Sequence, residues 1–222
     1  MAPLWNLCAA AVADFQSPGR FARVSAEVQR APRALERAAL AALHDALIDV
    51  SAPRILTLSY SASVSRVLQR IAAERQIEIV CAESLPAREG ERLYREVIGA
   101  GARGSVVLDT ELTTCLPGAT AAVLGADAVG AQAWINKAGT FGLAAAAWFS
   151  NVPVYVVAAR AKAQASALEP LMTPLPRAFE RTPSHLATLF LTDAGPISPD
   201  DLPAISERFA AEVASFLEFW RD

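Results

Sequence analysis

The chain has few lysines, histidines and cysteines. Of its 20 basic residues two are lysines, Lys137 and Lys162, and all the others are arginines. The 2 histidines and 3 cysteines form neither a C-x-x-C pair nor a Cys/His cluster, which argues against a zinc site. We therefore expect no metal and no cofactor. Cys8, Cys81 and Cys115 are expected to be ordinary buried thiols.

Long apolar runs and an excess of positive charge are also absent. With 53% hydrophobic and 19% charged residues the composition is that of a globular protein, and its apolar runs are too short to span a bilayer. The first residues lack the basic region of a secretory signal, so we expect a cytoplasmic protein with no membrane partner. The net charge of −3 argues against binding of nucleic acid, which needs a basic surface.

Two common functional motifs are missing. The sequence contains no G-x-x-x-x-G-K-[ST] and no G-x-S-x-G, which argues against a P-loop and the serine nucleophile of an α/β-hydrolase. A G-x-G-x-x-G pattern occurs at residues 99–104, but it follows a predicted helix and precedes a predicted strand, whereas a classical dinucleotide site needs it between a strand and a helix.

The pattern of apolar segments predicts a short helical N-terminal segment, residues 1–53, followed by an α/β domain, residues 54–222. Short segments rich in Val, Ile and Leu alternate with amphipathic helices, which is typical of a Rossmann-like, doubly wound and mostly parallel sheet. We expect strands at 54–58, 77–82, 105–109, 121–126, 152–158 and 187–193, and helices at 61–75, 89–99, roughly 110–116, 137–150 and 199–220.

Polar residues follow several of these predicted strands. In a doubly wound sheet ligands bind beyond the carboxyl ends of the strands, where helix N-termini offer free N–H groups. Because the predicted helix at 137–150 begins beside an amide and an ammonium, we expect it to hold an anion. The candidate ligand-binding residues are Ser59, Ser61, Glu83, Arg88, Asp127, Asn136, Lys137, Gly139 and Thr140.

Each of these residues also has a purely structural interpretation. Asp127 and Asn136 are suited to capping a turn or a helix, and Ser59 and Ser61 precede a predicted helix. Lys137 could be a solvated surface charge, although the scarcity of lysine elsewhere argues that an ammonium is wanted there.

Five blocks of sequence, in order, resemble one protein family. They are ILTLSYSASVSRVLQRI, VCAESLPAREG, VLGADAV with WINKAGTFGLA, VPVYVVAARAK and ERTPSHLATLFLTDAGPISP. Their order and spacing resemble the family of the regulatory alpha, beta and delta subunits of translation initiation factor 2B. That family includes methylthioribose-1-phosphate isomerase and ribose-1,5-bisphosphate isomerase. The GAD motif followed by NK-x-GT is the most specific part of the resemblance, which covers about residues 54–200.

The resemblance implies a dimeric protein with a phosphosugar or nucleotide pocket between a helical and a Rossmann-like domain. In the isomerases a Cys after the first strand and the Asp of GAD transfer protons, while the Asn and Lys of NK-x-GT hold the ligand. Asp127, Asn136 and Lys137 match these positions. The position of the Cys is Ser59, a poor proton carrier without a neighbouring base. The family's phosphate-binding Arg is replaced by Leu85, with Arg88 as a possible substitute.

Two functions follow from these matches and departures. The first is an initiation-factor-2B-like protein, expected to be a homodimer, that binds a sugar phosphate or nucleotide without isomerase activity. The alternative is an aldose-ketose isomerase acting on a ribose-phosphate-type substrate, with Asp127 as the base and Ser59 or water relaying a proton.

Overall fold

The fold is built on a seven-stranded sheet with the strand order β10-β9-β7-β4-β1-β2-β3. We describe it from a computed structural model, which places residues 20–164 and 174–207. Neighbouring strands are parallel except for β10, which runs antiparallel to β9 at one edge. The strands are β1 (Arg54–Thr57), β2 (Glu78–Ala82), β3 (Arg103–Val107), β4 (Ala121–Gly125), β7 (Val154–Val157), β9 (Leu189–Thr192) and β10 (Gly195–Ile197).

The strand order creates a switch point between β1 and β4. The chain first builds the sheet in one direction, through β1, β2 and β3, and then crosses back to place β4, β7 and β9 on the other side of β1. This is the order of the doubly wound Rossmann fold, in which ligands bind where the direction reverses. The predicted fold class is therefore confirmed, and Ser59, Ser61 and Asp127 follow the two strands at the switch point.

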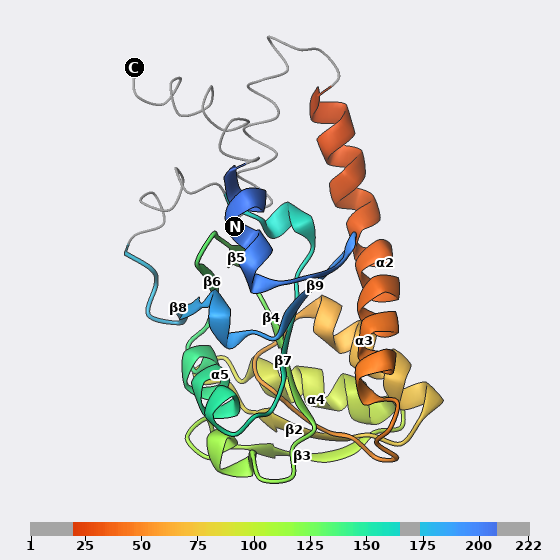
Figure 1. Cartoon of the computed structure of the whole chain (residues 1–222). Helices are drawn as coiled ribbons and strands as arrows, with labels where there is room; N and C mark the ends of the chain where they lie inside the picture. Colours follow the sequence, from red (N-terminus) through yellow and green to blue (C-terminus); the bar gives the residue numbers. More distant parts are fainter. Residues whose placement is uncertain (1–19, 165–173, 208–222) are drawn as a thin grey trace.

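Helices cover both faces of the sheet. On β4, Ala121 and Val123 belong to one buried cluster, whereas Ala122 and Leu124 belong to the other. The first cluster includes side chains of α2 (Arg20–Leu47), α3 (Ala62–Glu74) and α4 (Glu89–Gly99), and the second includes side chains of α5 (Thr140–Phe149). Figure 1 shows α2 and α5 on opposite sides of the strands. Burial on both faces explains why the strands read as continuous apolar runs.

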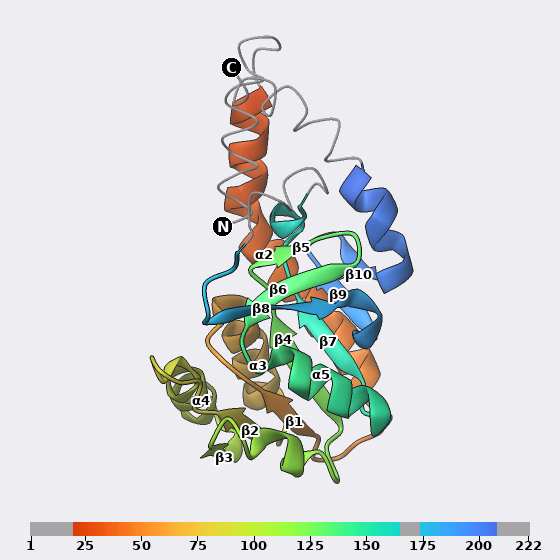
Figure 2. The same ribbon diagram turned by 90° about the vertical axis from the view of Figure 1, so that its left-hand side faces the viewer.

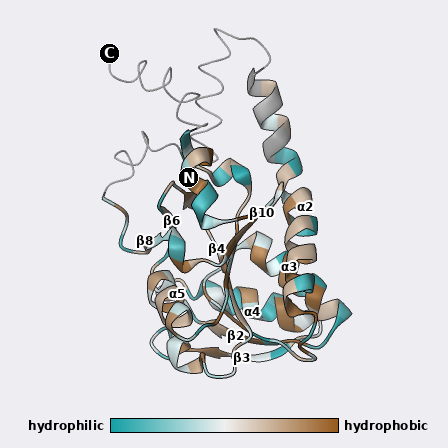
Figure 3. Cartoon of the chain, in the orientation of Figure 1, coloured by the Kyte–Doolittle hydropathy of each residue, from teal (hydrophilic) through white to brown (hydrophobic). Residues whose placement is uncertain are grey.

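Helix α2 is amphipathic and packs on the sheet. Leu35, Ala39, Leu43 and Leu47 recur at helical spacing, and all four are buried in the same cluster as residues of the sheet. Figure 3 shows hydrophilic and hydrophobic colours alternating along the lower part of this helix. The N-terminal helix thus contributes to the core of the α/β unit, while the predicted boundary at residue 53 stays a prediction.

A second, small sheet corrects one predicted element. Asn136 and Lys137 were predicted to begin a helix at 137–150, but they end strand β6 (Ala133–Lys137), and α5 begins at Thr140. Strand β6 lies between β5 (Ala128–Val129) and β8 (Phe179–Pro183). Figure 2 shows β6 and β8 running across one end of the central strands. Local spacing could not reveal this strand, because its main partner, β8, lies far along the chain.

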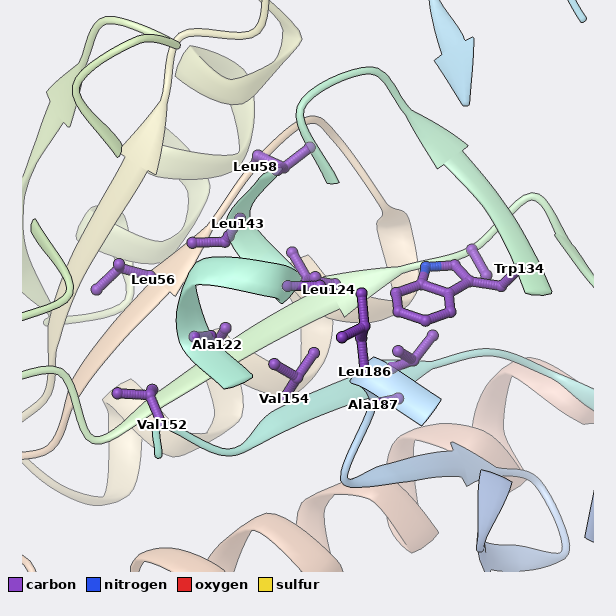
Figure 4. Close-up of a cluster of buried hydrophobic side chains, with 14 of the residues drawn as sticks. Leu56, Leu58, Ala122, Leu124, Trp134, Leu143, Val152, Val154, Leu186 and Ala187 are labelled. Carbon is purple, nitrogen blue, oxygen red and sulfur yellow. The ribbon is translucent and has the colours of Figure 1, made fainter. Parts of the chain in front are cut away.

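Trp134 anchors the small sheet to the core. Its side chain is fully buried and meets the Phe190 ring edge to face, with the ring centroids 5.6 Å apart. Figure 4 shows the indole beside Leu124 and Leu186 within the cluster on the α5 side. Trp134 therefore has a packing role, and its position fixes β6 directly above the end of β4.

The remaining predicted elements are present with small changes. Strand β3 begins and ends two residues earlier than predicted, and the helix expected at about 110–116 is a short 3-10 helix, Leu112–Cys115. The predicted helix at 199–220 begins with a 3-10 turn, Pro199–Asp201, and continues through residue 207; the rest lies outside the described residues. Among the described residues, no helix is long and apolar enough to cross a membrane.

Candidate functional site

The candidate site lies along the carboxyl ends of β1, β2 and β4, with the end of β6 above them. A direct ion pair joins two of its elements: Lys137 Nζ, at the end of β6, lies 2.6 Å from Glu89 Oε1, in the first turn of α4. The Lys137 side chain is only 8% exposed, and that of Glu89 is 24% exposed. Lys137 is therefore a buried ammonium with a carboxylate partner, and not a solvated surface charge.

The Ser59 hydroxyl binds the same carboxylate oxygen. Ser59 Oγ lies 3.3 Å from Glu89 Oε1, so the Ser59 hydroxyl and the Lys137 ammonium converge on one acceptor. The other oxygen, Glu89 Oε2, is buried and has no hydrogen-bond partner within the described part of the chain. An acceptor of this kind is suited to a hydroxyl or N–H donor of a ligand.

Ser59 is held in place by the loop after β2. Its N–H donates to Ser84 Oγ at 2.7 Å, and both Ser59 and Ser84 adopt positive φ angles, 62° and 65°. The Asp109 carboxylate, beyond β3, accepts from Ser84 N at 2.7 Å and from Leu85 N at 2.8 Å. Positive φ is uncommon for residues other than glycine and is concentrated at functional sites. Asp109 thus fixes the loop that fixes Ser59.

Asn136 and Ser61 lie on either side of Gly125. A Cβ placed on Gly125 would lie 2.8 Å from the Ser61 Cβ and 3.9 Å from Asn136 Oδ1, so both side chains lie beside the end of β4. Asn136 Nδ2 donates to Thr140 Oγ1 at 3.0 Å, and the Thr140 hydroxyl donates to the Lys137 carbonyl at 2.7 Å. Thr140 is fully buried and shapes the turn into α5. Ser61 caps α3 by accepting from Val64 N at 3.5 Å.

Asp127 and Lys162 occupy the other end of the site. Asp127 is half-buried, and its N–H donates to the Ile135 carbonyl at 2.7 Å, which joins the end of β4 to β6. Lys162 ends a 3-10 turn, Arg160–Lys162, after β7, and its ammonium donates to the Ala126 carbonyl. Burial lowers the pKa of the Lys162 ammonium, and the charge of Asp127 opposes this by raising it. Both lysines of the chain therefore lie at the carboxyl ends of the strands.

The N-terminus of α5 is bonded to a carboxylate of the protein itself. Glu180 Oε1, on β8, accepts from Gly139 N at 2.8 Å and from Phe141 N at 2.7 Å. Gly139 has a φ of 101° and precedes the first residue of the helix. Two of the N–H groups at the helix terminus that was expected to hold a ligand anion therefore already have an anionic partner.

Arg88 and Glu83 pair with each other at the edge of the site. The guanidinium of Arg88 lies 3.5 Å from Glu83 Oε2 and 2.5 Å from Glu91 Oε1. Glu83 is buried, whereas the Arg88 side chain is 58% exposed. Leu85, at the position where the resemblance leads one to expect an arginine, is exposed. The charge of Arg88 is thus shared between two carboxylates.

Neither described cysteine takes the place of the isomerase thiol. Cys81 lies within β2, and Cys115 lies near the opposite ends of the strands, where its carbonyl accepts from Arg54. The Cys81 Sγ donates to the Gly90 carbonyl at 3.3 Å. Burial, with a smaller contribution from Asp109, raises the pKa of the Cys81 thiol to about 12, so it stays protonated near neutral pH. Cys8 lies outside the described residues.

Three acidic residues of this region, Glu89, Asp109 and Glu180, are not among the residues predicted from the sequence. Glu89 and Asp109 follow strands β2 and β3, so their positions relative to the strands could have revealed them. Glu180 could not be found in this way, because it reaches α5 only through the pairing of β6 with β8. Ser59 and Lys137 meet at Glu89, Ser61 and Asn136 lie beside Gly125, and Asp127 follows the end of β4. Arg88 and Glu83 lie at the edge.

Comparison with known proteins shows the family to which the chain belongs. A family model described as the initiation factor 2 subunit family matches residues 21–170. An eIF-2B subunit 2-like protein of Pyrococcus furiosus is 32% identical over 162 residues, covering 71% of this chain and 57% of that protein. A methylthioribose-1-phosphate isomerase of Chloroflexus aurantiacus is 23% identical over 189 residues, covering 72% of this chain and 54% of the enzyme. The chain thus spans little more than half the length of these relatives.

Solved structures show the same fold. The translation initiation factor eIF-2B of Pyrococcus horikoshii OT3 superposes with a TM-score of 0.73 at 25% identity, covering 91% of this chain and 78% of the other. A tetrameric eIF2B-beta2-delta2 complex from C. thermophilum gives a TM-score of 0.70 at 19% identity, covering 89% of this chain and 70% of the other. With the family model matching well over half of its residues, the chain belongs to the initiation factor 2 subunit family.

Proposed function

We propose that this protein binds a phosphorylated sugar or nucleotide at the carboxyl ends of its strands and does not catalyse isomerisation. The observation that carries the proposal is the convergence of the Lys137 ammonium and the Ser59 hydroxyl on Glu89, whose second oxygen is buried without a donor. Together they offer the remaining N–H donors of Lys137 and one acceptor, Glu89 Oε2, at the switch point of a Rossmann-like sheet, where ligands bind in such folds.

Serine at position 59 is the reason for proposing binding without turnover. In the isomerases that this chain resembles, a thiol is expected to carry a proton at this position. Cys81 lies within β2, where its thiol is fully buried and is protonated near neutral pH. Asp127 is then left without the thiol that acts with it in those isomerases.

The contact of Ser59 with Glu89 supports an aldose-ketose isomerase as the second candidate. A carboxylate 3.3 Å from the hydroxyl supplies the neighbouring base that the sequence alone did not reveal. In such an enzyme Asp127 would remove the proton from the substrate carbon, and Ser59 with Glu89 would relay a proton between the substrate oxygens. Lys137 would stabilise the enediolate formed between these steps.

Thermal stability with a panel of ribose phosphates, methylthioribose 1-phosphate and nucleoside monophosphates tests the proposal. A ligand at about 100 times its Kd adds about 2.7 kcal/mol to the free energy of unfolding. We expect one phosphorylated compound to stabilise the wild type and to have a weaker effect on Lys137→Met. The same compounds are then assayed for aldose-to-ketose conversion. Turnover that is lost in Asp127→Asn would favour the isomerase, and no stabilisation by any compound would contradict both candidates.

We also propose that the protein forms a homodimer through the outer face of α5. Phe141, Trp148 and Phe149 are 47%, 54% and 79% exposed, and the helix carries no charged residue. Phe179, on β8, is exposed beside the N-terminus of the helix. Clusters of exposed aromatic side chains are typical of protein interfaces, and an uncharged face is compatible with a second copy of itself.

A further inference from the structure

We propose that Lys162 binds the phosphate group of the ligand and that Lys137 and Glu89 bind its hydroxyl groups. This division of roles rests on the function proposed above. It follows from a difference between the two lysines: Lys137 forms an ion pair with Glu89 at 2.6 Å, whereas the ammonium of Lys162 donates to a neutral carbonyl, that of Ala126.

The two ammonium groups therefore differ in how well they can attract an anion. A phosphate approaching Lys137 would also approach the Glu89 carboxylate bonded to it, and like charges repel. Lys162 has three N–H donors, of which Ala126 accepts one. Asp127 acts on Lys162 only as a nearby charge, and no direct ion pair joins the two among the described residues. Lys162 is thus the better receptor for an anion.

The Lys137–Glu89–Ser59 cluster has the opposite character. It presents the buried acceptor Glu89 Oε2, which needs a donor that a fully ionised phosphate lacks. A sugar hydroxyl can donate to Glu89 and at the same time accept from a second N–H of Lys137. A polyol is therefore suited to this cluster, and a phosphate is not.

The topology separates the two clusters by a distance that suits a phosphorylated sugar. Lys162 follows β7, Ser59 follows β1, and β4 lies between these strands. Neighbouring strands are about 4.8 Å apart, so the ends of β7 and β1 lie roughly 10 Å apart. Ser61 and Asn136 both lie beside Gly125 at the end of β4, the strand between β7 and β1. A pentose phosphate would lie across Gly125 with its phosphate toward Lys162.

Calorimetric titration with three probes, inorganic phosphate, ribose 5-phosphate and ribose, tests this orientation. For Lys162→Met we expect binding of inorganic phosphate and of ribose 5-phosphate to weaken at least ten-fold, with binding of ribose unchanged. For Lys137→Met we expect ribose and ribose 5-phosphate to bind more weakly, while inorganic phosphate still binds. Lys162→Gln, which can still donate to the Ala126 carbonyl, replaces the Met variant if that variant does not fold.

Arg160→Gln is the matched control, because it removes a positive charge from the same 3-10 turn. Its guanidinium lies 3.2 Å from Asp193 and is half exposed, so phosphate binding should be unchanged. Phosphate binding by Lys162→Met equal to that of the wild type would overturn the orientation but not the proposed function. The orientation would also be overturned if Arg160→Gln weakened phosphate binding as much as Lys162→Met does, because this would indicate a general effect of charge. If the wild type binds neither phosphate-bearing probe, this orientation is wrong; if it also binds none of the wider panel, the proposed function fails too.

Discussion

The ion pair between Lys137 and Glu89 joins the end of β6 to the first turn of α4. We expect Glu89→Ala to lower the free energy of unfolding by about 1–3 kcal/mol, because it leaves an almost fully buried ammonium without its partner. A double-mutant cycle with Lys137→Met, measured by urea unfolding, tests this. The loss of unfolding free energy in the double variant should be smaller than the sum of the losses in the two single variants.

The exposed pair Arg70 and Glu74 is the control for this cycle. Their side chains are 60% and 42% exposed and lie 3.8 Å apart, so their coupling should be at most about 0.5 kcal/mol. A coupling between Lys137 and Glu89 no larger than this would show that the pair makes no special contribution to the site.

The raised pKa of the Cys81 thiol predicts that the free energy of unfolding falls at alkaline pH. Its pKa is about 12 in the folded protein and 9.0 for an unperturbed thiol, so the unfolded state loses this proton first. The contribution of the protonated Cys81 thiol to the free energy of unfolding is therefore fully present below pH 9 and is lost as the pH rises toward 12. Between pH 9 and 10.5 this thiol alone should cost about 2 kcal/mol. Urea unfolding of the wild type and Cys81→Ala checks this, and equal pH slopes for both proteins would contradict it.

At the residue scale the sequence predicts which side chains gather better than it predicts what each one does. Ser59, Ser61, Asn136 and Lys137 could be placed together, because residues after parallel strands share one edge of the sheet. The partners of Lys137 and Ser59 could not be predicted, since the choice of Glu89 depends on how α4 approaches the end of β6.

At the scale of elements, Glu180 links β8 to the N-terminus of α5. Its carboxylate accepts two backbone N–H groups, so Glu180→Ala should lower the free energy of unfolding by about 1 kcal/mol. The amide protons of Gly139 and Phe141 should also exchange faster with solvent. Glu180→Gln, which keeps a hydrogen-bond acceptor, should lower the free energy of unfolding less than Glu180→Ala does. If both amides keep their exchange rates in Glu180→Ala, the carboxylate does not cap this helix.

The strand that contains Asn136 and Lys137 shows where local patterns fail. The inner strands of the main sheet, β2, β1, β4, β7 and β9, are largely apolar because they are covered on both faces, and this signal is visible in the sequence. Strand β6 places polar residues at its end and is held by pairing with β8, whose sequence is polar as well. Only the long-range pairing distinguishes this segment from the start of a helix.

For the whole molecule, the exposed face of α5 predicts self-association. We expect light scattering after size-exclusion chromatography to give twice the mass of one chain for the wild type. Trp148→Glu should give the mass of one chain, because a charge would be buried in the interface. Ile48→Arg is the control: Ile48 is 70% exposed just after the end of α2 and should leave the mass unchanged. A single-chain mass for the wild type would contradict the proposed dimer.

The central claim is that the carboxyl ends of the strands bind a phosphorylated small molecule. The most direct measurement is the phosphorus NMR spectrum of a mixture of sugar phosphates and nucleoside monophosphates, recorded with wild type and with Lys137→Met/Lys162→Met. The account predicts that the wild type broadens or shifts the resonance of at least one compound and that the double variant leaves it sharp. Resonances unchanged by the wild type at millimolar concentrations, or changed equally by both proteins, would contradict it.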